Sequence, residues 1–237
     1  MSRKHIVQWI VLQRWFGIAL VSLLAPFAVF AHGVAEGDAQ FLERIQGMHI
    51  IPYMYLGAKH MVTGYDHLLF LAGVIFFLYR LKEVALYVTL FAIGHSSTLL
   101  LGVLTGLHVN PFLIDAIIGL SVVYKALDNM DAFRTLFGWQ PNPKLAVLLF
   151  GFFHGFGLAT KLQELNLSRD GLVPNMLAFN VGVEIGQLLA LSAILLVMNY
   201  WRRTASFTRH AYGANVVILT AGFVLTGLQL TGYLTAQ

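Results

Sequence analysis

The chain contains 237 residues, of which 58% are hydrophobic and only 11% are charged, whereas a soluble domain carries about 25% charged residues. This composition excludes an ordinary soluble enzyme and indicates an integral membrane protein. The formal net charge is +4, but three basic residues, Arg3, Lys4 and Arg14, precede the first apolar run. The charge therefore does not indicate a nucleic-acid partner. Cysteine is absent, which excludes disulfides and thiolate metal sites.

The N-terminus has the pattern of a targeting segment. A basic stretch is followed by an apolar run from Trp15 to Phe30 and by small residues at Val29 and Ala31, as in a secretory signal peptide. We expect residues 1–31 to be removed, which would leave His32 as the mature N-terminus. If the segment is not cleaved, it is a first transmembrane helix and the chain has seven spans.

The remainder, residues 32–237, is predicted to be a single all-α membrane domain, a polytopic bundle of six transmembrane helices in contact with the lipid bilayer. A weaker segment at 41–59 is expected to be an interfacial helix. Each later apolar segment approaches the length of about 20 residues that crosses a bilayer. These segments lie at 64–80, 84–107, 112–128, 145–161, 176–200 and 213–234.

The basic residues predict the orientation of the bundle. Alternate loops contain seven basic residues on one side and four on the other, and the more basic side faces the cytoplasm in most membrane proteins. The loops near Arg80, Lys144 and Arg203 are therefore expected to be cytoplasmic, with the mature N-terminus outside.

Ionisable side chains interrupt the apolar segments. They are Asp66 and His67 at the start of the first, His95 in the second, His154 in the fourth and Glu184 in the fifth. A charged group at the centre of a membrane helix costs at least about 2.5–3.5 kcal/mol, so each is a candidate functional residue. On the third segment, Lys125 and Asp128 are three residues apart and are expected to form an ion pair.

Helix geometry allows these groups to form one site. His95 and His154 lie about 13–17 Å from the cytoplasmic ends of their segments, and Glu184 lies about 12 Å from the outer end of its own. We therefore predict a metal site formed by five residues on four helices. Supporting positions, next to the ligands or on the path to them, are predicted at His60, Ser96, Thr98, Asn180 and Gln187.

Imidazole and carboxylate without thiolate suit a divalent transition metal, namely nickel, cobalt or zinc. A permease is favoured, because a mixed ligand set can replace the hydration shell and still release the ion. One alternative is an intramembrane zinc hydrolase, in which His67, His95 and His154 hold the metal and Asp66 or Glu184 is the general base. The other alternative is a metal-handling accessory or sensor protein.

Four blocks of the sequence resemble the HupE/UreJ family of membrane proteins. They are Gly57–Leu71, Gly94–Leu99, Phe153–Ala159 and Phe179–Gln187. The resemblance is closest to the second branch of the family, because the fourth-segment block contains one histidine, His154, where the other branch has two. Members are hydrogenase and urease accessory proteins regarded as nickel or cobalt permeases, so the resemblance implies nickel or cobalt as the substrate and the inner membrane of a bacterium as the location.

Overall fold

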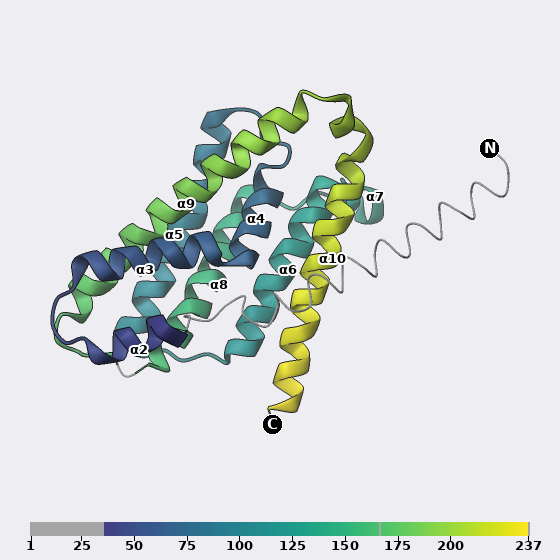
Figure 1. Ribbon diagram of the computed structural model, residues 1–237. Coiled ribbons are helices and arrows are strands. Elements are labelled where there is room, and N and C mark those ends of the chain that lie inside the picture. The colour runs from purple at the N-terminus through teal and green to yellow at the C-terminus, as the bar shows by residue number, and fades with distance from the viewer. Residues whose placement is uncertain (1–35, 166, 237) are drawn as a thin grey trace, which may run out of the picture.

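The computed structural model describes residues 36–165 and 167–236, and this part of the chain is helical without a β-strand. The predicted signal segment, residues 1–31, lies outside the described residues. The helices form a bundle in which α4 lies among the longer helices (Figure 1). In chain order they are α2 (Glu36–Arg44), α3 (Ile50–Thr63), α4 (Tyr65–Ile75), α5 (Leu81–Thr105), α6 (Pro111–Asn129), α7 (Ala132–Phe137), α8 (Pro143–Gln163), α9 (Leu172–Arg202) and α10 (Ala205–Thr235).

Four of the predicted spans, α5, α8, α9 and α10, are each long and apolar enough to cross a membrane. At 19 residues, α6 reaches about 28 Å, but it carries three charged side chains. The first predicted span differs most, because α4 has only 11 residues and reaches about 16 Å. It follows α3 directly across Gly64, whose backbone is extended at φ −72° and ψ 104°. The predicted interfacial segment is divided between α2 and α3, and α3 packs along α9.

Glycine allows α3 and α9 to lie almost in backbone contact. A Cβ at Gly57 would overlap the carbonyl oxygen of Phe179, and one at Gly182 would overlap the carbonyl oxygen of Met54. Small residues at such crossings let helices approach closely in a membrane, where van der Waals packing replaces the hydrophobic effect. These two helices therefore form one tightly packed pair.

The pairs α5/α8 and α6/α10 are built in the same way. A Cβ at Gly155 would overlap the carbonyl oxygen of His95, and the hydroxyl of Thr98 donates to the carbonyl of Phe152 across the helix interface at 2.7 Å. In the second pair, a Cβ at Gly119 would lie 2.7 Å from the backbone nitrogen of Thr226. The long helices are thus joined as three pairs.

Polar contacts fix α4 between these pairs. Arg202 at the end of α9 donates to the carbonyls of Ile75 and Phe76 at the end of α4, the latter at 2.8 Å. Asn129 of α6 donates to the carbonyl of Gly73 at 2.9 Å. Carbonyls of the last helical turn have no partner within their own helix, and Arg202 satisfies two of them.

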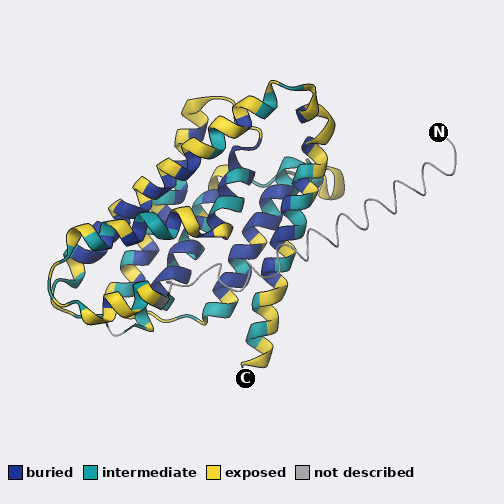
Figure 2. Ribbon diagram, viewed as in Figure 1, coloured by how far each residue is buried: buried dark blue, intermediate teal, exposed yellow. Residues whose placement is uncertain are grey.

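Buried side chains concentrate where the helices face one another, and the outward faces of the long helices are exposed (Figure 2). The outward face of α9 includes Leu189 at 61% and Leu196 at 73% exposure. Such faces suit a lipid environment, because hydrocarbon rather than water then surrounds them. The predicted pairing of Lys125 with Asp128 is confirmed by an ion pair between their side chains.

Candidate metal centre

The imidazole of His67, in the first turn of α4, lies at the centre of a group of histidines from four helices. Its ring centroid is 5.0 Å from His60 on α3, 5.0 Å from His154 on α8 and 5.8 Å from His95 on α5. His67, His95 and His154 are each at most 1% exposed. The predicted proximity of these three histidines is therefore present in the structure, and His60 joins them.

The donor atoms form two overlapping sets in which all members lie within 4.8 Å of one another. One set contains His60, His67 and His95, and the other contains Asp66, His67 and His154. Nitrogen ligands about 2.1 Å from a tetrahedral ion are about 3.4 Å apart. The donors are thus near coordination distance, and small side-chain rotations would bring three of them onto one ion.

His95 shows most clearly that this site suits a bound cation. It is fully buried near the middle of α5, and neither ring nitrogen has a hydrogen-bond partner among the described residues. The Nε2 atom of His60 is likewise buried without a partner there. Leaving a buried polar atom unsatisfied costs about 1–3 kcal/mol, so an ion or ordered water accounts for these nitrogens better than apolar packing does.

His154 is oriented as a ligand by its own helix. Its Nδ1 lies 2.7 Å from the carbonyl oxygen of Phe150, one turn earlier on α8. Because a carbonyl only accepts, Nδ1 must carry the proton, so Nε2 is the nitrogen that a metal would use. This is the usual arrangement of metal-binding histidines, whose second nitrogen is held by a carbonyl or carboxylate. The helix break places Asp66 beside His67, with Oδ1 of Asp66 3.2 Å from Nδ1 of His67.

Gly64 leaves the space that these two side chains occupy. A Cβ at Gly64 would lie 2.8 Å from Nδ1 of His67 and 3.1 Å from Oδ1 of Asp66. Phe91 packs against the histidines, with its ring centroid 5.0 Å from that of His154 and 5.9 Å from that of His95. The cluster therefore has an apolar aromatic neighbour.

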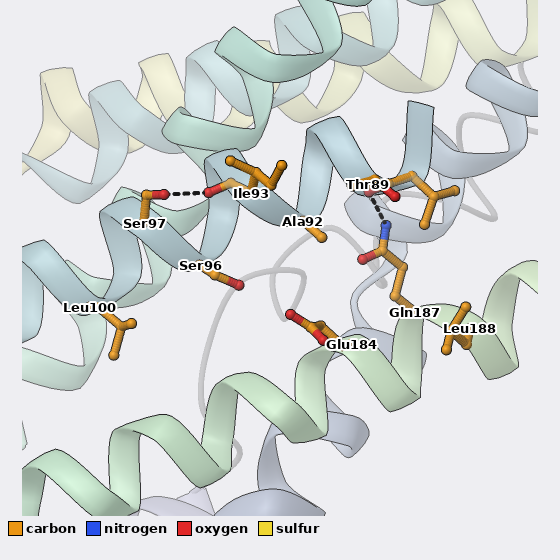
Figure 3. Close-up of a pocket in the computed structure, with 10 residues that line it drawn as sticks. Thr89, Ala92, Ile93, Ser96, Ser97, Leu100, Glu184, Gln187 and Leu188 are labelled. Carbon is orange, nitrogen blue, oxygen red and sulfur yellow. Dashed lines mark hydrogen bonds between the residues drawn. The ribbon is translucent and has the colours of Figure 1, made fainter. Parts of the chain in front are cut away.

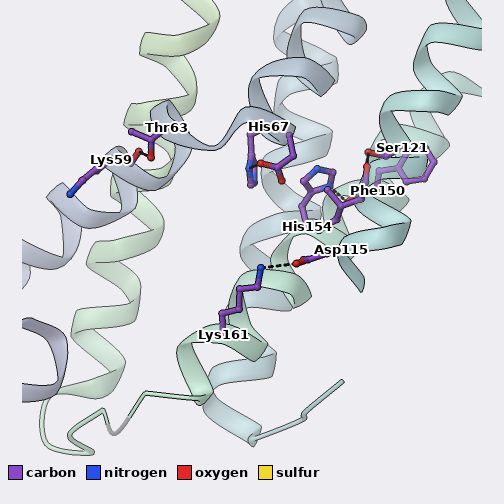
Figure 4. Close-up of polar contacts among 10 residues, drawn as sticks. Lys59, Thr63, His67, Asp115, Ser121, Phe150, His154 and Lys161 are labelled. Carbon is purple, nitrogen blue, oxygen red and sulfur yellow. Dashed lines mark hydrogen bonds and ion pairs between the residues drawn. The ribbon is translucent and has the colours of Figure 1, made fainter. Parts of the chain in front are cut away.

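A buried ion pair involves Lys161, which lies further along α8 than His154 (Figure 4). The ammonium group of Lys161 is 2.7 Å from Oδ2 of Asp115 on α6, and Asp115 is 4% exposed. His154, Gly157 and Lys161 are spaced by three and four residues, so they share one face of α8. This pairing could not be predicted, because Asp115 and Lys161 are on different helices and residue spacing does not relate α6 to α8.

Glu184 lies outside both donor sets. It lines a cavity between α5 and α9 together with Ser96 and Gln187, and Figure 3 shows Glu184 and Ser96 pointing toward one another across it. Gln187 is 1% exposed and donates to the carbonyl of Val88 at 3.4 Å. Asn180 is buried, and both atoms of its side-chain amide lack a partner among the described residues.

Two features of the donor cluster go beyond the sequence prediction. His60 was expected on the path to the site rather than among the donors, and Gly64 was not singled out. The seven-residue interval from His60 to His67 would correspond to two turns of a continuous helix. The signal available in the sequence was the intervening Gly64, because a glycine within an apolar segment can mark an interruption.

A model of the family described as HupE / UreJ protein matches residues 36–237. The chain belongs to the HupE/UreJ family. The match covers every described helix and agrees with the resemblance carried by the four sequence blocks. This HupE/UreJ protein is a multi-pass, metal-handling membrane protein by family and by its long apolar helices. No curated protein and no solved structure matches the chain.

Proposed function

We propose that this HupE/UreJ protein is a permease for nickel or cobalt ions. In this proposal Asp66, His67, His95 and His154 bind the ion inside the bundle, and His60 joins them as a further donor. The observation that carries the proposal is His95, a fully buried imidazole beside other histidines, whose two ring nitrogens have no hydrogen-bond partner within residues 36–165 and 167–236. A structural histidine would instead be expected to hydrogen-bond within the bundle.

The composition of the cluster suits a transported ion. Imidazole and carboxylate are ligands for nickel and cobalt, and the affinity order of divalent metals places both ions above iron and manganese. The cluster contains one carboxylate, Asp66, which offsets half the charge of a divalent ion. The site therefore attracts the ion less strongly than a site with two or more carboxylates would. Donors from separate helices also allow the set to be taken apart when helices move, as transport requires.

The test is the metal content of the full-length protein purified in detergent, together with uptake of nickel and cobalt into proteoliposomes. We expect His95→Ala and His67→Ala to lose bound metal and uptake. His210→Ala is the matched control, because His210 is exposed on α10 and contacts Ser206. Equal metal content and uptake in wild type and His95→Ala would refute the proposal.

The same preparations distinguish the hydrolase alternative. A zinc hydrolase would retain stoichiometric zinc after purification and would cleave a lipid or peptide substrate. Cells that lack the protein would then take up nickel and cobalt normally. Asp66→Asn is informative here, because neutralising a general base abolishes turnover with the metal retained, whereas neutralising a ligand lowers metal affinity.

A further inference from the structure

The cavity between α5 and α9 contains a carboxylate that the donor cluster does not use. The cavity has a volume of about 430 Å³ and is lined by five apolar and five polar residues. Glu184 lies within a helix long and apolar enough to cross a membrane. Glu184 is exposed rather than packed in the bundle core, and a charged group in such a helix is costly unless it is paired or hydrated, which makes it a candidate functional residue.

Oxygen donors converge in this cavity. The hydroxyl oxygen of Ser96 is buried and lacks a hydrogen-bond partner among the described residues. Figure 3 shows this hydroxyl directed toward Glu184, and the amide oxygen of Gln187 directed into the same space. The amide nitrogen of Gln187 is held by Val88, which orients the oxygen. A buried hydroxyl that faces a carboxylate and is not used by the protein offers a second oxygen to a water or a cation.

The cavity adjoins the donor cluster through α5. Ser96 follows His95 directly in the sequence, and consecutive residues of a helix point about 100° apart. His95 faces the other histidines, whereas Ser96 faces α9. Two consecutive residues of α5 therefore face the imidazole cluster on one side and a cavity with oxygen donors on the other.

We infer that the cavity is a second cation site, in which Glu184, Ser96 and Gln187 hold a hydrated divalent metal ion before it reaches the histidines. Oxygen ligands suit an ion that keeps its waters, whereas imidazoles replace them. Six waters occupy about 180 Å³ at about 30 Å³ each, which fits within the cavity. The inference rests on the proposed transport function and gives Glu184 a role separate from the donor cluster.

The test compares nickel uptake and nickel content of the full-length protein in Glu184→Gln and Ser96→Ala. Removing an outer contact to a metal lowers affinity by about 10–100-fold, so Glu184→Gln should raise the half-saturating nickel concentration for uptake by that factor. At saturating nickel, its bound metal should equal that of wild type. Ser96→Ala should change uptake in the same direction by a smaller factor.

Ser97→Ala is the matched control. Ser97 also borders the cavity, but its hydroxyl already donates to the carbonyl of Ile93 at 2.6 Å, so uptake should not change. Glu184→Asp retains the charge and should recover part of the loss, which separates the site from a folding defect.

Two results would overturn the inference. If Glu184→Gln empties the protein at saturating nickel as His95→Ala does, Glu184 is a ligand of the donor cluster. If the half-saturating concentration is unchanged in Glu184→Gln, the cavity is not on the path of the ion. Failure of the proposed function is a separate result, namely full binding and uptake in His95→Ala.

Discussion

Replacing Gly64 by alanine should weaken metal binding without weakening the fold. The added Cβ would lie 2.8 Å from Nδ1 of His67, about 0.6 Å inside the shortest ordinary contact of 3.4 Å. Metal sites tolerate about 0.2 Å in ligand distance, so His67 must move farther than the site allows. We expect the affinity for nickel to fall about 10–100-fold, which corresponds to about 1.4–2.8 kcal/mol.

The fold should tolerate this change, because the backbone of Gly64, at φ −72° and ψ 104°, is open to alanine and the 3.1 Å contact of the added Cβ with the carbonyl oxygen of His60 requires a shift of only a few tenths of an ångström. Replacing a glycine at a compatible position stabilises a protein by about 0.4–1 kcal/mol, since it restricts the unfolded chain. Thermal unfolding in detergent should therefore show an unchanged or higher midpoint without metal and a smaller upward shift when nickel is added.

Gly213→Ala is the control for Gly64→Ala. Gly213 is in α10 with no atom within 4 Å of an added Cβ, so nickel affinity should be that of wild type. If Gly64→Ala binds nickel as tightly as Gly213→Ala does, Asp66 and His67 are not ligands in the arrangement described above. If Gly64→Ala fails to fold without metal, the extended Gly64 has a structural role that its dihedral angles do not indicate.

Helix packing, the buried ion pair and membrane orientation give three further tests. Gly155→Val places a branched side chain against a carbonyl of α5 and should lower the free energy of unfolding by about 1–3 kcal/mol. Denaturation in detergent measures this change, and an unchanged free energy of unfolding would contradict the close approach of α5 and α8. Lys161→Met leaves Asp115 buried without its cation and should cost about 3–5 kcal/mol. Adding Asp115→Leu should recover most of that loss, and a double variant as unstable as the single one would contradict the pairing. The chain has no cysteine, so an introduced cysteine is labelled specifically. Ser168→Cys, on the predicted outer side, should react with an impermeant thiol reagent in intact cells, and Ser206→Cys, on the predicted cytoplasmic side, should not. Labelling at 206 alone would reverse the topology.

The sequence predicted the donors better than it predicted their grouping. Ionisable residues within apolar segments were conspicuous, and depth along each helix placed His95 and His154 at similar levels. The structure brings both histidines to His67. Depth is only one coordinate, however, and the direction in which a side chain points around its helix depends on helix packing that one sequence does not reveal.

Glu184 illustrates this limit. It lies across the α5/α9 cavity from Ser96, the residue that follows His95 in the sequence. It faces Ser96 rather than His95, because the two residues of α5 point in different directions. The helix interruption at Gly64 was hidden for another reason, since hydropathy marks the start of an apolar segment at residue 64 but does not register the direction of the backbone there.

The glycine contacts that join the helices in pairs also restrict how the bundle can change shape. Backbones in direct contact at Gly57, Gly155 and Gly119 leave little room for sliding within a pair, so each pair should move as a stiff unit. The donors are divided among these units, with His60 on the α3/α9 pair, His95 and His154 on the α5/α8 pair, and Asp66 and His67 on the short helix between them. If the protein is the proposed permease, rocking of the α3/α9 pair against the α5/α8 pair would separate His60 from His95 and His154, so that opening the bundle and releasing the ion would be coupled.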